Sequence, residues 1–288
     1  MQTVTTLDLL RNAVASLRSD GATLALVPTM GALHDGHLAL VRDARERADA
    51  VAVSIFVNPT QFGQGEDLNA YPRQLERDAE LLEAEGVDLL WAPSVDTMYP
   101  HGFATTVSVR GVSDGFCGAS RPGHFDGVAT VVCKLFNQVR PDMAVFGEKD
   151  WQQLAVIRRM ARDLDLTRPS ADAIHGLPTV READGLAMSS RNAYLSPEHR
   201  AAAATLPRAM IEAIARIEDG QAVEPTLQTL QYALAGAGFE QVDYAELADA
   251  ESMEPLAEPV ERPMRLLVAA RIGGTRLIDN MAVASVAA

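Results

Sequence analysis

Two histidines three positions apart carry the most chemical information in this chain. His34 and His37 lie in the stretch TMGALHDGH, which begins at Thr29. Gly31 and Gly36 let the backbone approach a ligand closely, and the first N–H groups of a helix have no partner inside the helix. Such a helix start attracts an anion, and two imidazoles facing it can stabilise charge that builds up on a phosphate during transfer. The stretch therefore predicts a phosphate-binding turn.

A purely structural interpretation of this turn competes with the chemical one. A histidine near a helix start often only caps the helix or is solvated, and turn glycines often serve the turn alone. Here the two histidines flank Asp35-Gly36 directly after an apolar, strand-like run, which favours the functional interpretation. The glycine spacing matches neither the dinucleotide-binding fingerprint nor the phosphate loop of nucleotide hydrolases.

The elements around the turn indicate a parallel α/β fold. An apolar run at 23–27 precedes the turn, a helical pattern at 38–48 follows it, and a continuous apolar run at 50–57 comes next. A strand that is apolar throughout is typical of a parallel sheet covered on both faces. Further elements are expected as helices at 7–18, 72–85, 127–139 and 151–164 and as strands at 87–91 and 142–146.

The second part of the chain has a different pattern. Residues 92–126 are mostly irregular, with a strand-like alternation at 105–110, and the polar stretch 63–69 predicts a loop. We expect an α/β, Rossmann-like doubly wound parallel sheet over residues 1–176, followed by a smaller C-terminal α+β lid domain over 177–288. The lid is expected to contain helices at 197–217 and 223–235 and strands at 242–247, 265–270 and 276–280.

Two more polar turns follow predicted strands, where doubly wound sheets place their ligand-contacting loops. NPTQF (58–62) contains Gln61, whose amide can donate and accept and so suits a carboxylate with hydroxyl groups, although a loop amide as often satisfies local backbone. GEKD (147–150) contains Lys149, a cation that can neutralise phosphate charge although most lysines are only solvated, and Asp150, which can cap the next helix. Gln153 follows near the start of that helix.

Composition excludes several classes of protein. The chain has 288 residues, 48% of them hydrophobic, and a net charge of −14, so it lacks the basic footprint of a nucleic-acid binder. Its two cysteines give no disulfide framework, and the start MQTVTTLDLL has neither the basic nor the apolar region of a signal peptide. No apolar run approaches the ~20 residues that cross a bilayer. We expect a cytoplasmic protein that binds neither nucleic acid nor membrane.

The motifs together resemble a known family. TMGALHDGH is similar to the His-x-Gly-His signature of the nucleotidylyltransferase superfamily. With NPTQF, YPR (71–73), RPGHFDGVATVVCKLFN (121–137), GEKDWQQ (147–153) and LPTVREADGLAMSSRN (177–192), nearly the whole chain resembles the pantoate-beta-alanine ligase family. The resemblance implies ATP-dependent condensation of pantoate with beta-alanine to pantothenate through a pantoyl adenylate, releasing AMP and pyrophosphate. It also implies a homodimer.

The resemblance further implies a set of site residues. His34, His37 and Lys149 would be catalytic, Gln61 and Gln153 would bind pantoate, and Gln61 would also bind beta-alanine. Mg²⁺ would be held mainly through the ATP phosphates, without a protein metal site, although Asp78 could support it weakly through water. The ATP contacts implied are Met30, Gly31, Ala32, Leu33, His34, Asp35, Gly36, His37, Gly147, Glu148, Lys149, Asp150, Val180, Met188, Ser189, Ser190 and Arg191.

The sequence leaves two other functions open. Another His-x-Gly-His nucleotidylyltransferase would join a phosphate acceptor to a nucleotide and would not need both NPTQF and Gln153. A non-catalytic nucleotide-binding module would keep the glycines but tolerate loss of His37 or Lys149. Trp151 stands where the family usually has a smaller aromatic residue, which puts none of these roles in doubt.

Overall fold

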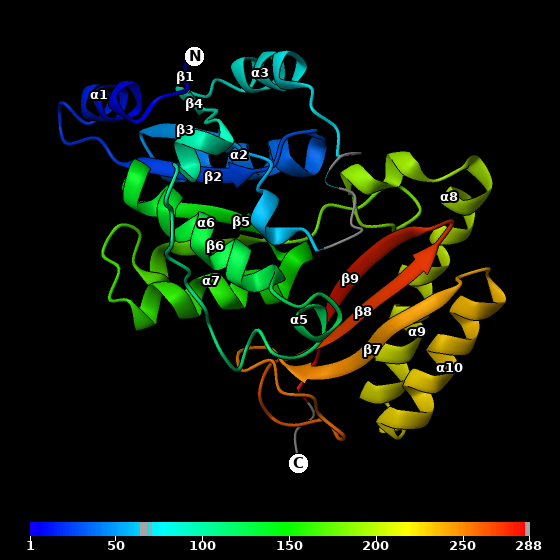
Figure 1. Cartoon of the computed structure of the whole chain (residues 1–288). Helices are drawn as coiled ribbons and strands as arrows, with labels where there is room; N and C mark the ends of the chain where they lie inside the picture. The colour runs from blue at the N-terminus through cyan, green and yellow to red at the C-terminus, as the bar shows by residue number, and fades with distance from the viewer. Residues whose placement is uncertain (64–67, 69–70, 286–288) are drawn as a thin grey trace. The chain divides into compact units, whose positions relative to one another are not determined.

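The computed structural model describes residues 1–63, 68 and 71–285, and the chain divides into two compact units (Figure 1). The first unit comprises Met1–Arg110, Arg121–Glu148 and Val156–Pro178, and the second comprises Gly111–Ser120, Lys149–Ala155 and Thr179–Ala288. The chain passes from the first unit to the second for the last time after Pro178, which is two positions beyond the boundary expected at 176. Most of the loop expected at 63–69 lies outside the described residues.

The first unit is built on a parallel sheet. Among the described residues, six strands lie in the order β1-β4-β3-β2-β5-β6, and every neighbouring pair is parallel. The chain turns to the other side of the sheet between β2 and β5, which makes these two neighbours the topological switch point where such folds bind ligands. The strands are β1 (Gln2–Val4), β2 (Leu24–Thr29), β3 (Ala50–Ile55), β4 (Leu89–Trp91), β5 (Met143–Gly147) and β6 (Ile174–Leu177).

Helices cover both faces of this sheet. The side chains of Ala25 and Val27 pack with Val41 of α2 in one buried cluster. Successive strand residues point to opposite faces, so Leu24 and Leu26, which are fully buried, face the other side. There α6 packs on β2 and on α1. The expected doubly wound α/β fold is confirmed. The helices that begin in this unit are α1 (Leu7–Leu17), α2 (Asp35–Arg47), α3 (Leu75–Ala84), α4 (Val95–Met98) and α6 (His124–Val139).

The second unit contains the expected α+β arrangement. Among its described residues, a three-stranded antiparallel sheet has the order β7-β8-β9, and α9 and α10 lie side by side against it (Figure 1). Leu206 and Met210 of α9, Leu230 of α10 and Val268 of β8 share one buried cluster. The elements are α5 (Cys117–Ser120), α8 (Pro197–Ala203), α9 (Thr205–Glu218), α10 (Val223–Gly236), β7 (Gln241–Asp249), β8 (Met264–Ile272) and β9 (Thr275–Val283), and α7 (Trp151–Asp163) begins here and ends in the first unit.

Two expectations from the sequence were wrong. Residues 105–110 form no strand, because the Val107 N–H donates to Thr130 Oγ1 on α6 at 2.9 Å and the segment packs on a helix instead. The single helix expected at 197–217 is two helices that meet at Ala204. Pro207 explains the break, because it has no N–H to bond the carbonyl of Ala203 and its ring clashes with that carbonyl in a continuous helix.

No helix among the described residues is both long enough and apolar enough to span a membrane.

Candidate active site

The TMGALHDGH turn leaves the carboxyl end of β2 at the switch point. Gly31 and Ala32 have φ of 82° and 52°, so the backbone passes through the left-handed region at two successive residues. A Cβ atom on Gly31 would lie 3.0 Å from Asp78 Oδ2 and 3.1 Å from Ile55 Cγ2. Glycine suits position 31, because a side chain would be strained at this φ and its Cβ would press on two neighbouring side chains.

Asp78, on α3, holds this turn by its carboxylate. Its Oδ2 accepts the Ala32 N–H at 2.8 Å and its Oδ1 accepts the Leu33 N–H at 2.9 Å, and the residue is only 1% exposed. A buried carboxylate is tolerated where backbone N–H groups satisfy it. Asp78 therefore fixes the backbone before α2. The amides of residues 32 and 33 are directed at this carboxylate, and both carboxylate oxygens have backbone partners.

His34 and His37 cap the start of α2 reciprocally. His34 Nδ1 accepts the Gly36 N–H at 3.1 Å, and His37 Nδ1 accepts the His34 N–H at 3.3 Å. The two ring centroids lie 4.1 Å apart. A ring nitrogen that accepts an N–H carries no proton, so each neutral imidazole has its proton on Nε2. Sequence reasoning weighed capping against chemistry for these residues. Capping is compatible with a chemical role, because capping through Nδ1 makes Nε2 a donor.

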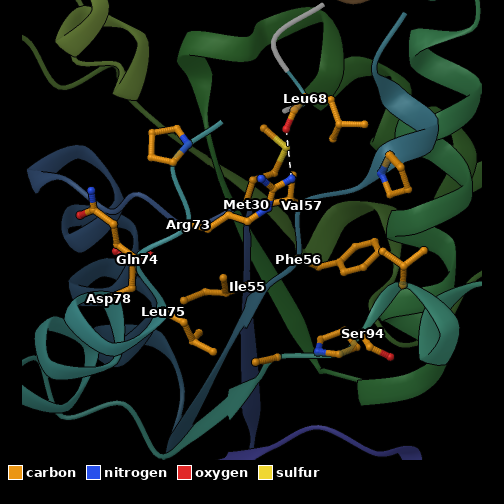
Figure 2. Close-up of a pocket in the computed structure, with 16 residues that line it drawn as sticks. Met30, Ile55, Phe56, Val57, Leu68, Arg73, Gln74, Leu75, Asp78 and Ser94 are labelled. Carbon is orange, nitrogen blue, oxygen red and sulfur yellow. Dashed lines mark hydrogen bonds between the residues drawn. The ribbon is translucent and has the colours of Figure 1, made fainter. Parts of the chain in front are cut away.

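A cavity of about 410 Å³ lies beside the turn at the carboxyl ends of β3 and β4. Met30, Gly31 and Asp78 form part of its wall, and Phe56 and other apolar side chains form much of the rest. Figure 2 shows the Arg73 side chain reaching Leu68, whose carbonyl oxygen accepts from Nη2 at 3.0 Å. Met30 borders this cavity and also contacts Gln61.

The NPTQF segment forms a short 3-10 turn, η1 (Pro59–Gln61), after β3. Asn58 is 1% exposed, and its Nδ2 donates to Gln61 Oε1 and to the carbonyl oxygen of Gly127, each at 3.1 Å. Gln61 Nε2 lies 3.0 Å from Met30 Sδ. Gln61 thus lies next to the TMGALHDGH turn, as expected for adjacent strands, and Asn58 orients its amide.

His124 and Arg121, which begin and precede α6, bind the backbone of the same turn. The Gln61 carbonyl oxygen lies 2.8 Å from His124 Nδ1 and accepts from Arg121 Nη2 at 3.4 Å. Arg121 Nη1 lies 3.0 Å from His124 Nε2. Since a guanidinium only donates, His124 Nε2 accepts and Nδ1–H donates to Gln61. Both side chains hold the backbone of Gln61.

Lys149 begins the segment of the second unit that follows β5. Its ammonium lies 3.4 Å from Asp150 Oδ2, and its carbonyl oxygen accepts from Asn280 Nδ2 at 2.8 Å. Arg265 Nη1 donates to Asn280 Oδ1 at 2.6 Å and the Arg265 guanidinium stacks 3.5 Å above the Trp151 ring, whose Nε1 donates to the Ala250 carbonyl oxygen. The large aromatic residue at 151 is therefore explained by a stacking and hydrogen-bonding role.

The serine-rich segment forms a short turn in the second unit. The Met188 N–H donates to the Val180 carbonyl oxygen at 3.0 Å, and Ser189 Oγ accepts the Arg191 N–H at 3.3 Å. Arg181 anchors this turn with two bonds to Asp279, at 2.7 and 2.9 Å. Val180 and residues 188–191 thus lie together.

The predicted site residues lie in both units, and in the second unit they lie on two segments. In the first unit, Met30 contacts Gln61, and the parallel pairing of β2 with β5 puts their last residues, Thr29 and Gly147, at the same edge of the sheet. In the second unit, Lys149, Asp150 and half-buried Gln153 begin one segment, and Val180 and 188–191 form another. Among the residues described, no group of three or more His, Cys, Asp or Glu side chains could hold a metal ion.

Fold and site together define the class: a doubly wound α/β protein with a His-x-Gly-His turn at its switch point, the arrangement of a nucleotidyl-transfer enzyme. The family model described as Pantoate-beta-alanine ligase matches residues 2–282. The chain belongs to this family of ligases.

Relatives and solved structures match this chain over nearly its full length. Pantothenate synthetase of Novosphingobium aromaticivorans is 67% identical over 283 residues, which is 98% of this chain and 99% of the relative. That of Sphingopyxis alaskensis is 61% identical, covering 98% and 100%. The crystal structure of the Thermus thermophilus enzyme has a TM-score of 0.91 at 49% identity, covering 98% and 99%. The Francisella tularensis ligase, solved with beta-gamma ATP and beta-alanine, has a TM-score of 0.82 at 33% identity, covering 98% and 97%.

Proposed function

We propose that this chain condenses pantoate with beta-alanine in two steps driven by ATP. The pantoate carboxylate attacks the α-phosphorus of ATP, forming pantoyl adenylate as pyrophosphate leaves. The neutral amine of beta-alanine then attacks the acyl carbon, loses a proton, and forms the amide of pantothenate as AMP leaves. Neither step requires a covalent bond to the protein.

The observation that carries this proposal is the reciprocal capping of α2 by His34 and His37. With Nδ1 of each ring accepting a backbone N–H, each neutral imidazole has its donor at Nε2. Two such donors suit an α-phosphate whose oxygens gain charge in the transition state, because they stabilise that charge without reorganisation. We assign both rings to hydrogen-bond donation at the α-phosphate.

The remaining roles are supported by position and by the family. Lys149 supplies a point cation to the phosphates. Gln61 and Gln153 bind pantoate, and Gln61 also borders the beta-alanine position. The amides of Ala32 and Leu33 are used by Asp78, so any contact of these two residues with ATP involves their other atoms. Other ATP contacts are proposed at Met30, Gly31, Asp35, Gly36, Gly147, Glu148, Asp150, Val180, Met188, Ser189, Ser190 and Arg191.

Magnesium enters this proposal as the companion of ATP. Asp78, the acidic side chain beside the turn, already has a backbone N–H on each oxygen, so the ion would be held mainly by the nucleotide phosphates. There it neutralises phosphate charge. We further propose a cytoplasmic homodimer that binds neither nucleic acid nor membrane; light scattering of the purified protein tests the dimer.

Exchange of labelled pyrophosphate into ATP tests the proposal. We expect exchange only when pantoate is present and without any need for beta-alanine, because the adenylate forms before the amide. Exchange without an acid would contradict this order. If a phosphorylated alcohol proved to be the required acceptor, another nucleotidylyltransferase activity would replace the one proposed.

A further inference from the structure

A chain of hydrogen bonds within the first unit begins at Tyr99 and ends at the Gln61 amide. Tyr99 directly follows α4, and its half-buried hydroxyl donates to Asn58 Oδ1 at 2.8 Å. Burial raises the pKa of the Tyr99 hydroxyl, so it remains protonated and able to donate at neutral pH.

The surroundings of Asn58 allow only one orientation of its amide. Oδ1 accepts from Tyr99 Oη at 2.8 Å, from Thr60 Oγ1 at 2.9 Å and from the Thr60 N–H at 3.3 Å. On the other side, Nδ2 faces two acceptors, the Gly127 carbonyl oxygen and Gln61 Oε1. A flipped amide would set its NH₂ group against the Thr60 N–H and its oxygen against the Gly127 carbonyl oxygen, two groups that cannot exchange roles as a hydroxyl can. Asn58 is buried, so water cannot compensate for such a mismatch.

The orientation of Asn58 determines the orientation of Gln61. Because Asn58 presents N–H, the Gln61 atom that faces it must be the acceptor Oε1. The Gln61 NH₂ group therefore points away, where Nε2 lies 3.0 Å from Met30 Sδ. A thioether is a weak acceptor, so an oxygen acceptor from a ligand would bond this group better. Gln61 thus offers a donor to the ligand, whereas the sequence allowed either a donor or an acceptor.

The backbone below this amide is fixed as well. A Cβ atom on Gly127 of α6 would lie 2.4 Å from the Thr60 carbonyl oxygen and 2.6 Å from the Gln61 nitrogen. Glycine at 127 therefore lets η1 lie directly on α6. With the turn packed directly on α6, the hydrogen bonds from Tyr99 and Asn58 decide which end of the Gln61 amide faces the ligand.

We propose that Tyr99 is a positioning residue for the acid substrate: through Asn58 it directs the Gln61 N–H toward an acceptor oxygen. This position then selects a carboxylate or hydroxyl oxygen of pantoate and disfavours an ammonium group. The inference rests on the proposed function, since it names the contact within that site that recognises the acid.

Tyr99→Phe tests the proposal because it removes only the hydroxyl and keeps the ring beside Phe56 and Phe103. The matched control is Tyr232→Phe, whose parent residue is 69% exposed on α10. We expect calorimetry to give a pantoate Kd about 5- to 10-fold higher for Tyr99→Phe, the scale of one net hydrogen bond. The Kd for ATP should stay unchanged, and the control should match the wild type for both ligands.

Asn58→Asp gives a second test, because it places an acceptor against Gln61 and should turn the Gln61 oxygen toward the ligand. Pantoate affinity should then fall by about 100-fold, the scale of facing an acceptor with an acceptor, while ATP binding persists. An unchanged pantoate Kd in Tyr99→Phe, or equal losses for ATP and pantoate in both variants, would overturn the proposal.

Failure of the proposed function would give a different result from failure of the role proposed for Tyr99. A wild-type protein that binds no pantoate would overturn that function. The positioning role of Tyr99 is then judged without substrate, from the side-chain NH₂ resonances of Gln61, identified by their loss in Gln61→Glu. Tyr99→Phe should shift these resonances, and unshifted resonances would overturn the positioning role.

Discussion

The two units hold their proposed reactive side chains by different kinds of contact. In the first unit, His34 and His37 are fixed by uncharged backbone hydrogen bonds within one helix turn. In the second, the Lys149 carbonyl is bound by Asn280, a residue 131 positions further along the chain, and Asn280 is bound in turn by Arg265. Changes to the first set should therefore alter chemistry more than stability, and changes to the charged contacts of the second should alter stability first.

The largest expected effect is on the stability of the second unit. Asp279 has a side chain that is 0% exposed and bonds Arg181 through both oxygens. Arg181→Ala leaves that buried carboxylate without its cation, although the Asn280 N–H still donates to Oδ1, and this should lower the free energy of unfolding by about 3 kcal/mol. Urea unfolding followed by circular dichroism measures the loss. The control is Arg159→Ala, which removes an exposed ion pair with Asp163. Equally small losses of stability in both variants would contradict the expected difference between a buried and an exposed ion pair.

A paired substitution separates the capping role of His34 from its chemical role. Asn is a good N-cap, but its shorter side chain cannot place its NH₂ group where His34 has Nε2–H, and Ala has neither group. Both His34→Asn and His34→Ala should reduce the pyrophosphate exchange rate about 100-fold, the scale of losing one preorganised donor. Only the Ala variant should also lose about 1 kcal/mol of stability. An Asn variant with the wild-type rate would show that the imidazole serves only as a cap.

Asp78→Asn should slow the exchange reaction less than the His34 variants do, and it should also lower stability. The amide replaces one of two acceptors with a donor, so either the Ala32 or the Leu33 N–H loses its partner. An unsatisfied buried N–H costs about 1–3 kcal/mol, and we expect a loss of that size in unfolding experiments together with a slower exchange rate. The neighbouring Glu76→Gln, on an exposed position of α3, should change neither. Wild-type stability in Asp78→Asn would mean that the turn holds its conformation without this carboxylate.

The smallest effect is expected at Arg265. Lysine keeps the charge of Arg265 and can still donate to Asn280 Oδ1. It loses the planar stack on Trp151, a contact worth about 1 kcal/mol at this half-buried position. Arg265→Lys should therefore lower the thermal midpoint by a few degrees at most while leaving the KM for pantoate unchanged. A large change in that KM would place Arg265 in the acid site, and the contrast between the units would then need revision.

The difference between local and long-range contacts also decides how much of the fold and site could be predicted from the sequence. The strand-turn-helix around His34, the doubly wound sheet and the α+β second unit were predicted because their signals are local in sequence. The site residues named from the sequence remain predictions. Tyr99 was missed because its partner Asn58 lies 41 positions away and nothing in an irregular stretch marks its hydroxyl. Asn280 was missed for the same reason, and the orientation of the Gln61 amide depends on both long-range and buried contacts that no spacing reveals.

One measurement tests the central claim, attack of the pantoate carboxylate on ATP, most directly. Pantoate labelled with ¹⁸O in its carboxylate is incubated with ATP, beta-alanine and the enzyme, and the AMP is analysed by mass spectrometry. Because the oxygen that attacks phosphorus stays with AMP when the amine displaces it, the account predicts one ¹⁸O atom in each AMP formed. AMP without ¹⁸O, with all of the label recovered in other molecules, would contradict adenylate formation.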